Sequence, residues 1–573
     1  MVVGSDSLKG VLQGALMIHC NWEIAGKCKP QSVEGILEVL LQNRGLDSAF
    51  LSGSLKDLEP HLAIRGMDEG ALLMAEHLAA GNKVVLIGDY DCDGITSAAQ
   101  LVHFLRDIGY DNYEVVIPQR AEGYGVPERA VRHHPEASLF VAMDCGTHDF
   151  HSVSAARKLG CDFIVIDHHE VSKNGLAPAT VLINPKQPSC PSTFKDFCAS
   201  GLTLLFLARL RKALDGRFTL PKLGGKYLSL AAIGTVTDLV PLVEANRILT
   251  RSGLVCMNAR TYLPVERLAE SAGLSGKVLT AGHIGYYLGP RINAAGRMAE
   301  ARLALDFLTA EEEESAGELA DELNRLNAKR QLQEGQILNR IRERFAREHA
   351  GGRTLILWDP QWPHGVLGII ASRVQQELHY GPAIIFQIDD KTGLARGSAR
   401  SVPGFDIYAA LKSCENLLLK WGGHKMAAGM TIDKRNLEIF SDRFEEVAGA
   451  YPAETFIPRR KIDMEIDLNL VSPQLFSMLK QMEPHGLGNP LPTFAARNIQ
   501  VAVQRVFGRE GKHLQLILDN RIDGIFWRGG QCLPKDWRNN DPMDLVFQIE
   551  WDDFRGRPVL SIKDVGKVNT LWS

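Results

Sequence analysis

The stretch KVVLIGDYDCDG, residues 83–94, decides the fold of this chain. Its apolar, β-branched first half predicts a buried parallel strand, and Asp89, Asp91 and Asp93 follow directly after that strand. If the strand continued, the three carboxylates would share one face; if the chain turns, the closing glycine permits the bend and a helix over 96–105 follows. In both cases the carboxylates cluster.

Two more stretches repeat this layout of an apolar strand followed by polar side chains. They are LFVAMDCG (139–146), which contains Asp144, and FIVIDHH (163–169), which ends in Asp167, His168 and His169. Strands that alternate with helical patterns predict a doubly wound parallel sheet, in which ligands bind at the carboxyl edge. Alone, Asp144 would more often be a helix cap or a surface residue, but three matching strands predict one shared crevice.

The clustered carboxylates of these stretches need compensation, because mutual repulsion and desolvation are costly. Divalent cations are the usual compensation, and carboxylates with one or two imidazoles favour Mn²⁺, Mg²⁺ or Fe²⁺ over zinc. Two neighbouring cations usually indicate phosphoryl chemistry. A calcium loop of the DxDxDG type is the alternative interpretation, but the downstream glutamate of such a loop is missing, since Val102 and its neighbours are apolar.

A fourth candidate is Asp238, inside the apolar run LAAIGTVTDLVPL (230–242). A carboxylate there is costly to bury unless something pairs with it. A helix cap is the alternative interpretation, and the residues alone leave both open. Cys92 and Cys145 also lie inside the acidic motifs, but soft thiolates suit hard cations poorly, so we expect both to pack in the core.

Length and composition describe an ordinary globular chain of 573 residues, 45% hydrophobic and 23% charged. Its length predicts roughly three or four domains. The formal net charge of −4 means that any nucleic-acid contact must come from local basic patches. We expect no membrane span, because no apolar stretch reaches about 18 residues. The ten cysteines form no CxxC pair and are interpreted as reduced cytoplasmic thiols.

Pattern changes along the chain predict five regions. They are a helical lead-in (1–65), a first α/β domain (66–285), a connecting helical region (286–350), a second α/β domain (351–457) and a small β-barrel (458–573). The connecting region contains a charged stretch whose spacing suits one long exposed helix with a packed stripe. The stripe comprises Leu319, Leu323, Leu326, Leu332, Ile337 and Ile341.

The motifs resemble those of the DHH phosphoesterase superfamily. The likeness rests on DYDCDG (89–94), the strand-end Asp144, DHH (167–169), IPQRAEGYG (117–125), GTVTDLVPL (234–242), GPRINAAGRM (289–298), HGVLGIIASR (364–373), GSARS (397–401), GGHKMAAGM (422–430) and EPHGLGNPLPTF (483–494). Each motif is moderately specific, whereas the ordered set, which runs over nearly the whole chain, is strong. The resemblance implies that the second α/β domain is a DHH-associated substrate-binding domain and the barrel an OB fold.

The resemblance also implies a set of site residues. The metal positions are Asp89, Asp91, Asp93, Asp144, His168, His169 and Asp238, and they imply two divalent cations, Mn²⁺ or Mg²⁺. The catalytic residues are His168, His169 and Asp167, which is expected to orient one imidazole. One departure is Ile87, since many members of the superfamily carry a histidine two residues before the first aspartate. That departure concerns the second cation and not the reaction class.

Further positions match residues that contact the substrate in the superfamily. They are Arg120, Arg291, Arg297, Arg373, Ser398, Arg400, Gly422, Gly423 and His424. The run GGHKMAAG is glycine-rich and loop-like, so backbone N–H groups and a cation there could cradle a phosphate. For each arginine alone, a surface salt bridge is the alternative interpretation.

The implied activity is metal-dependent 5′-to-3′ hydrolysis of single-stranded DNA, in DNA repair and recombination. The expected partners are single-stranded DNA, a helicase and a single-strand-binding protein, and the expected state is a cytoplasmic monomer. One alternative is a DHH-family phosphodiesterase acting on short oligonucleotides or small phosphoesters, and another is a non-catalytic single-stranded-DNA-binding protein. Because every expected ligand lies between Asp89 and Asp238, a chain cut after Pro458 is expected to keep its metal site.

Overall fold

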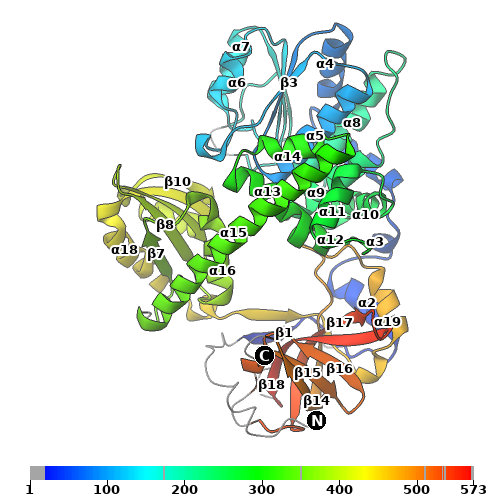
Figure 1. The fold of residues 1–573 in the computed structure, drawn as a ribbon, viewed down its shortest axis with the longest axis vertical. Coiled ribbons are helices and arrows are strands. Elements are labelled where there is room, and N and C mark those ends of the chain that lie inside the picture. Colours follow the sequence, from blue (N-terminus) through cyan, green and yellow to red (C-terminus); the bar gives the residue numbers. More distant parts are fainter. Residues whose placement is uncertain are drawn as a thin grey trace. The chain divides into compact units, whose positions relative to one another are not determined.

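Two compact units make up the chain (Figure 1). The computed structural model describes residues 20–568 except 27, 172–174, 349–350, 509–510, 532 and 534–536. Unit 1 comprises Met1–Ser48, Gln333–Met482 and Leu491–Ser573, and unit 2 comprises Ala49–Leu332 and Glu483–Pro490. The expected combination of a doubly wound sheet, a second α/β sheet, a long helix and a barrel is confirmed.

Unit 2 is built on a five-stranded parallel sheet with the strand order β3-β2-β4-β5-β6. The strands are β2 (Val84–Gly88), β3 (Tyr113–Val116), β4 (Leu139–Met143), β5 (Asp162–Ile166) and β6 (Val181–Ile183). The three strands expected from the acidic motifs are β2, β4 and β5. The chain passes from β2 to β3 on one side of β2 and then crosses to β4 on the other side of β2. The topological switch point therefore lies between β2 and β4.

Helices cover both faces of this sheet. Figure 1 shows α6 (Glu128–Arg132) and α7 (Phe150–Lys158) on one side, and α4 (Met67–Ala79), α5 (Cys92–Asp107) and α8 (Ala199–Ala213) on the other. Alternate residues of each strand therefore enter different cores. Val84 and Leu86 pack on the α5 side, whereas Val85 and Ile87 pack on the α6 side.

A helical layer follows the sheet in sequence and completes unit 2. It consists of α9 (Lys226–Thr237), α10 (Glu244–Asn258), α11 (Leu263–Ser271), the short α12 (Ala281–His283), the π-helical turn η3 (Ile284–Leu288), α13 (Gly289–Met298) and α14 (Arg302–Leu308). α9 packs against both α5 and α8, so its carboxyl end lies beside the acidic edge of the sheet. Earlier in the chain, α3 (Ala49–Ser52) and η1 (Leu55–Leu62) also belong to this unit.

Unit 1 contains a mixed five-stranded sheet with the order β10-β11-β9-β8-β7. Its strands are β7 (Leu355–Asp359), β8 (Ala383–Asp389), β9 (Leu394–Arg400), β10 (Leu418–His424) and β11 (Ala427–Asp433), with α16 (Leu367–Glu377), α17 (Ile407–Lys412) and α18 (Leu437–Gly449) packed on it. GGHKMAAG is therefore a tight β-hairpin, and its interpretation as a loop is wrong: β10 ends at His424 and β11 begins at Ala427. Glycine-rich sequence hid the strands because it lacks the usual β-branched pattern.

The expected long helix is α15 (Glu313–Glu348), which spans the division between the units. Leu323, Leu326, Ile337 and Ile341 are buried, as the stripe predicts, but Leu332 is exposed. Leu332 is the last residue of the helix in unit 2, and the helix continues in unit 1 from Gln333. The two parts of the helix pack on different cores, and Leu332 lies where one ends and the other begins.

A closed barrel forms the C-terminal part of unit 1. Its strands are β14 (Phe494–Phe507), β15 (His513–Leu518), β16 (Ile522–Phe526), β17 (Pro542–Asp552) and β18 (Arg557–Lys567), and the pairing of β14 with β17 closes the circle. This circular order, 1-2-3-5-4 by chain position, belongs to a five-stranded Greek-key barrel of the OB type. β13 (Met464–Glu465) and α19 (Pro473–Lys480) precede it.

The N-terminal region contains a strand that the sequence does not predict. The described part of residues 1–65 includes α2 (Val33–Asn43), as expected, but it begins with β1 (Asn21–Ile24), which pairs in parallel with β12 (Arg459–Ile462). The four residues of β1 are too few to show periodicity, and their partner lies far along the chain, at Arg459–Ile462. No helix in the described ranges is both long and apolar enough to cross a membrane.

Candidate metal centre

The acidic turn after β2 forms the first part of the site. Asp91 is the N-cap of α5, and its Oδ1 accepts the N–H groups of Asp93 and Gly94 at 2.9 and 3.2 Å. The strand therefore ends before Asp91, and the helix starts at Cys92, four residues earlier than expected. A calcium loop is ruled out at this position because α5 continues to Asp107. A Cβ atom at Gly94 would lie 2.5 Å from the Asp89 nitrogen, so only glycine allows this close approach.

Asp93 connects the turn to α8. Its two carboxylate oxygens accept the N–H groups of Ala199 and Ser200, at 2.7 and 2.8 Å, in the first turn of that helix. Its Oδ2 also lies 3.8 Å from Nε2 of His168. Asp93 thus holds the amino end of α8 against the acidic turn while facing the site.

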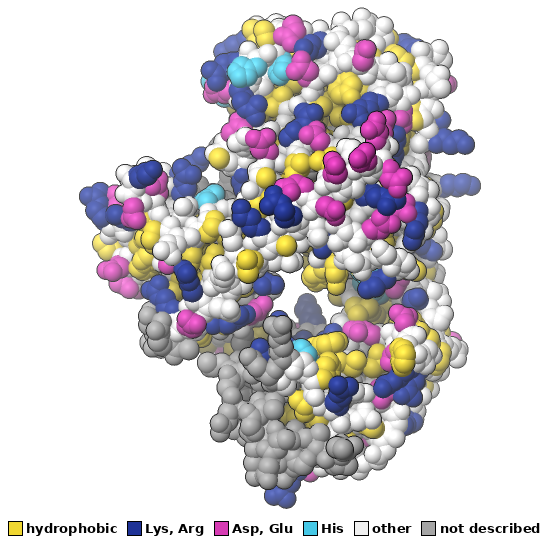
Figure 2. Space-filling model, viewed as in Figure 1, with side chains coloured by type: hydrophobic (Ala, Val, Ile, Leu, Met, Phe, Trp, Pro, Cys, Tyr) yellow, Lys and Arg dark blue, Asp and Glu magenta, His cyan; other side chains and the backbone are white. Residues whose placement is uncertain are grey.

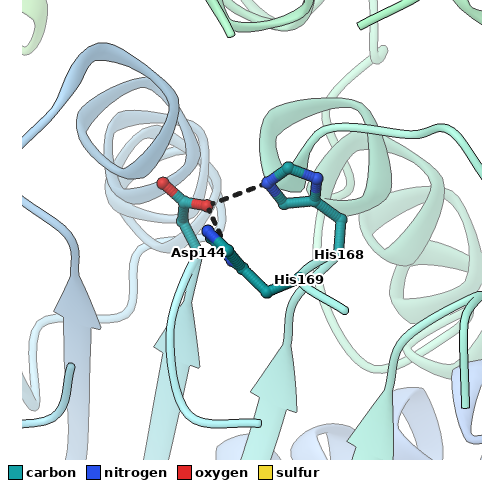
Figure 3. A group of neighbouring side chains, drawn as sticks. All are labelled: Asp144, His168 and His169. Atoms are coloured by element: carbon teal, nitrogen blue, oxygen red, sulfur yellow. Dashed lines mark ion pairs between the residues drawn. The ribbon is translucent and has the colours of Figure 1, made fainter. Parts of the chain in front are cut away.

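Asp144 follows β4 in a left-handed conformation with a φ of 62°. Few non-glycine residues adopt this region without support, and residues that do are concentrated at functional sites. Its Oδ1 lies 3.3 Å from Nε2 of His168 and 3.9 Å from Nδ1 of His169 (Figure 3). The interpretation of Asp144 as a surface residue or N-cap is therefore wrong, since its side chain is buried between the two imidazoles.

The three residues after β5 have different tasks. Asp167 is fully enclosed, and its Oδ1 lies 2.7 Å from Nδ1 of His169. The other oxygen of Asp167 accepts the N–H group of Thr147 at 3.1 Å. His168 instead points Nε2 at the carboxylates, as Figure 3 shows for Asp144. Asp167 therefore orients one imidazole, in the way the sequence suggests.

Asp238 is both the helix cap and the site residue that the sequence left as alternatives. It is the C-cap of α9, and its backbone N–H donates to the carbonyl of Gly234 at 2.9 Å. Its side chain turns back to the sheet, where Oδ2 lies 3.5 Å from Nε2 of His168. Nε2 of His168 is thus within 4 Å of carboxylate oxygens from Asp93, Asp144 and Asp238.

The electrostatics of this cluster follow from burial and like charge. Burial, followed by the charges of neighbouring aspartates, raises the pKa of Asp89, Asp144 and Asp238 well above the usual range, and that of Asp93 to about 7. Burial lowers the pKa of His168 to about 4. For His169, burial is outweighed by the hydrogen bond to Asp167, and the pKa rises to about 9. Without a cation the cluster is a strained group of partly protonated acids.

Several atoms of the cluster are suited to bind cations. Oδ1 of Asp89, Oδ1 of Asp144 and Nε2 of His168 are buried, and none makes a hydrogen bond within the described residues. Ligand atoms lie within 4.8 Å of one another in three overlapping groups: Asp89–Asp91–Asp144, Asp93–His168–Asp238 and Asp144–His168–His169. Hard oxygens with one or two imidazoles suit Mn²⁺ or Mg²⁺, and the overlap of the three groups would suit two neighbouring cations. The residues therefore fit a two-cation centre.

Ile87 and the two motif cysteines lie away from the cluster. The Ile87 side chain is fully buried on the α6–α7 side of the sheet. Cys92 and Cys145 are also buried in the apolar cores, as expected. None of the three belongs to a group that could hold a cation within the described ranges.

Three of the expected substrate-contacting arginines lie in unit 2. Arg120 stacks over the ring of Tyr90 at 4.3 Å and donates from Nε to the carbonyl of Gly296, so it lies beside the acidic turn. Arg297 lies near enough to influence Tyr90 electrostatically. Arg291, however, binds Oδ1 of Asn324 on α15 and the carbonyl of Tyr287. The structure brings Arg120 and Arg297 to the turn, whereas Arg291 ties α13 to α15.

The remaining expected residues lie in unit 1, and all of them except Arg373 are on its sheet. The register places Gly422 opposite Gly429, which is itself opposite Ser398, and places His424 in the same way across Ala427 from Arg400. The guanidinium of Arg400 lies 3.3 Å from Oγ of Ser398. The two glycine-containing motifs therefore form one polar surface across β10, β11 and β9. Arg373 is an exposed residue of α16.

Two residues of the site were missed by sequence reasoning. The Tyr124 hydroxyl lies 2.9 Å from both the Asp144 carbonyl oxygen and Nδ1 of His169, and its ring is half exposed. Asn293 on α13 accepts the N–H group of Cys92 at 3.0 Å. Both lie in the quoted motifs IPQRAEGYG and GPRINAAGRM, and only that placement could have singled them out.

The fold and the site together define a DHH-type phosphoesterase with an attached OB barrel. Residues 83–235 match the family model described as "DHH family, N-terminal domain", 351–450 match "DHHA1 domain" and 462–564 match "RecJ OB domain". The chain is 30% identical to the single-stranded-DNA-specific exonuclease RecJ of Escherichia coli, over 95% of this chain and 96% of that protein. It is 31% identical to RecJ of Bacillus subtilis, over 92% and 67% respectively. The chain belongs to the RecJ family.

A solved structure agrees with this assignment. RecJ from Thermus thermophilus in complex with Mn²⁺ superimposes with a TM-score of 0.81 and 29% sequence identity, and the match covers 97% of this chain and 80% of that one.

Proposed function

We propose that this protein is a metal-dependent exonuclease that hydrolyses single-stranded DNA in the 5′-to-3′ direction, in DNA repair and recombination. The observation that carries the proposal is the convergence of three aspartates on one buried imidazole, His168: Asp93 from α5, Asp144 after β4 and Asp238 at the end of α9. RecJ relatives that match nearly the whole chain supply the substrate class. A sheet edge at a topological switch point is where α/β proteins bind ligands.

We assign Asp89, Asp91, Asp93, Asp144, His168, His169 and Asp238 as the residues that would hold two cations, Mn²⁺ or Mg²⁺. A bound divalent cation supplies Lewis-acid chemistry at the phosphate, including the activation of water. Asp93 faces the same centre, and its bonds to the α8 amides hold the acidic turn in place.

The paired histidines have complementary roles in this proposal. His168 is neutral at pH 7, because burial lowers its pKa to about 4, and it therefore offers a lone pair to a cation. His169 is held by Asp167, and in the absence of cations, despite burial, this hydrogen bond raises the pKa of His169 to about 9. The His169 imidazole lies beside the cluster, where it can stabilise the charge that develops on the phosphate or donate a proton to the leaving 3′ oxygen.

The proposed substrate residues belong to both units. We propose that Arg120 and Arg297 contact phosphates near the cations, with Arg291 holding α13 in place. In unit 1, the surface of Ser398, Arg400, Gly422, Gly423 and His424, together with Arg373, contacts further phosphates, and the barrel also binds single-stranded DNA. Because the net charge of the chain is −4, binding to DNA must depend on such local basic patches. Lys and Arg side chains are interspersed with acidic ones on the face in Figure 2.

Digestion of end-labelled DNA tests the proposal. A single strand of about 60 nucleotides, several times the site size of one OB fold, is labelled at the 5′ or the 3′ end and incubated with Mg²⁺, Mn²⁺ or EDTA. We expect the 5′ label to be released first as a short product, only with a cation, while a blunt duplex resists digestion. Early release of the 3′ label would contradict the polarity, and no release with either cation would favour the non-catalytic alternative.

A substrate of two nucleotides separates the remaining alternative. A DHH phosphodiesterase for short oligonucleotides or small phosphoesters should turn over the dinucleotide faster than the long strand. We expect the reverse, because the OB barrel adds contacts that only a long strand can use. We also propose that the enzyme works as a cytoplasmic monomer with a helicase and a single-strand-binding protein, which supply and present the single strand.

A further inference from the structure

The segment that follows Asp238 has an unusual backbone. Between α9 and α10, Leu239 has a φ of 60° and Glu244 a φ of 43°, although neither is glycine. Such residues are unfavourable by about 1 kcal/mol or more each and persist only where the surroundings impose them. The conformation of the connection 239–244 is therefore imposed by its surroundings. The same holds for the position of Asp238, which directly precedes the connection.

A loop from far along the sequence contacts this connection. Residues 483–490 (EPHGLGNP) belong to unit 2, although the chain on both sides of them belongs to unit 1. The N–H group of Leu242 donates to the carbonyl of Leu487 at 2.7 Å. A Cβ atom at Gly488 would lie 2.9 Å from Cβ of Pro241, and one at Gly486 would lie 2.6 Å from Cδ1 of Leu242. The loop thus lies directly against the connection.

The loop is itself held in place by buried polar contacts. The guanidinium of Arg247 on α10 is almost fully buried, stacks on Phe50 at 4.1 Å and donates to the carbonyl of Glu483 at 2.9 Å. Asn489 is completely buried, and its side chain donates to the carbonyl of Pro484 at 3.0 Å. Its backbone also exchanges two hydrogen bonds with Gly486. These hydrogen bonds hold the loop in one conformation, so the loop can in turn hold the connection 239–244 in place.

We propose that loop 483–490 is a positioning element of the metal centre: by holding the connection 239–244, it places the Asp238 carboxylate beside His168. Gly488, Gly486 and Arg247 are the positioning residues. None touches a cation or the reacting atoms. The proposal rests on the assignment of Asp238 as a ligand, and it gives the EPHGLGNP motif a task that nucleic-acid binding does not explain.

Gly488→Ala in the full chain tests this directly, because the added methyl group meets Pro241. Gly273→Ala is the matched control, since Gly273 has nearly the same φ, 73° against 74°, and no described atom lies within 4 Å of the position that its added methyl group would take. Both variants carry the same backbone strain, so any difference between them reports the contact. The readout is Mn²⁺ affinity by titration calorimetry, together with the melting temperature in EDTA.

We expect Gly488→Ala to bind Mn²⁺ about 10- to 100-fold more weakly than the unaltered chain, as for other residues that orient a ligand. Gly273→Ala should bind normally, and both should melt at similar temperatures in EDTA. Equal Mn²⁺ affinity in the two variants would overturn the proposal. If Gly488→Ala does not fold, Gly486→Ala takes its place. Its methyl group meets the side chain of Leu242 rather than backbone, and severalfold weaker binding is expected.

Asp238→Ala separates this proposal from the proposed function. Normal Mn²⁺ binding by Asp238→Ala would remove the ligand assignment and this proposal with it. Weak binding by Asp238→Ala with normal binding by both glycine variants would overturn the loop's role alone and leave the metal centre as assigned.

Discussion

Asp144 combines an unfavourable backbone conformation with a carboxylate in the candidate metal centre. Its left-handed backbone turns the carboxylate between His168 and His169, where burial and neighbouring aspartates raise its pKa. Asparagine tolerates positive φ better than alanine, so Asp144→Asn removes the charge with little added strain. The residue is thus a place where charge can be tested apart from backbone conformation.

We expect Asp144→Asn to lose several orders of magnitude in hydrolysis, because a proposed cation ligand is lost. Its melting temperature in EDTA should stay equal or rise, since one of several mutually repelling acids has been removed. Turnover with Mn²⁺ and melting in EDTA are the measurements. Unaltered turnover in Asp144→Asn would contradict the ligand assignment.

His103, far from the cations, predicts a pH dependence of stability. Burial lowers its pKa from 6.5 to about 4, while Nε2 lies 2.9 Å from the carbonyl of Leu308. Between pH 6.5 and 4 the unfolded chain therefore binds a proton that the folded chain refuses, so the free energy of unfolding falls as the pH falls, by about 2 kcal/mol at pH 5.

His103→Gln should therefore lose less melting temperature between pH 7 and pH 5 than the unaltered chain, measured in EDTA. His133→Gln, at an exposed position, is the control and should behave like the unaltered chain. Equal losses in all three proteins would contradict the role of His103.

At the scale of elements, α13 supports the acidic turn from outside the sheet. Asn293 accepts the Cys92 N–H group, and a Cβ atom at Gly296 would lie 2.6 Å from the carbonyl oxygen of Tyr90. The helix therefore approaches the turn so closely that only glycine fits at this point. α13 therefore supports the acidic turn through its close packing and not through a charged side chain.

Gly296→Ala should push the acidic turn out of place and lower hydrolysis by about a hundredfold, the loss expected for a displacement near 1 Å. Gly317→Ala on α15 is the matched control, because no described atom lies within 4 Å of an added methyl group there. The control should keep its turnover and gain up to about 1 kcal/mol from helix propensity. Similar turnover in both variants would show that the approach of α13 is not needed.

The barrel presents an aromatic group that can stack on bases. The Trp527 ring is half exposed and lies edge-on to His513 at 5.0 Å and to Phe507 at 5.7 Å. Trp551 instead stacks on Phe476 at 5.2 Å. These surroundings favour Trp527 over Trp551 as a contact for DNA.

In an Asp91→Ala background, which prevents digestion, Trp527→Ala should weaken binding to a long single strand by about 1–3 kcal/mol. The dependence of binding on salt should stay the same, because no charge is lost. Leu72→Ala, at an exposed apolar residue of α4, is the control. Equal affinity of the two variants for the long single strand would show that Trp527 does not contact DNA.

At the scale of the whole molecule, the chain passes from unit 1 into unit 2 and back at loop 483–490. The sequence suggested that a cut after Pro458 would spare the metal site, because all expected ligands lie upstream. Such a cut also removes the loop that contacts Pro241 and Leu242, so the expectation overlooks a tertiary contact. The C-terminal part of the chain thus contributes to unit 2 as well as to the barrel.

We expect a chain that ends at Pro458 to bind Mn²⁺ more weakly than the full chain, in the direction of Gly488→Ala. It should also melt at a lower temperature, because Arg247 loses the Glu483 carbonyl to which it donates. Calorimetric titration with Mn²⁺ measures the first effect. Unchanged affinity in the shortened chain would restore the expectation from the sequence.

The sequence by itself determined the class of fold and most members of the site. Acids that follow three apolar strands must gather at one edge of a parallel sheet, because side-chain direction and strand polarity are local properties. Residues 83–94, 139–146 and 163–169 therefore predicted β2, β4 and β5 and the position of their acids. A small β-barrel and the long α15 were likewise visible in periodicity, whereas the OB type of the barrel came from the family resemblance.

Only the tertiary structure decided how these pieces are held. Asp93 binds amides 106 residues away, Tyr124 reaches His169, and the four residues of β1 find β12 far along the chain. The conformation of 239–244 is imposed by a loop that carries no signal of its task. Such contacts depend on the packing of the whole chain, whereas periodicity and propensity report only the nearest residues.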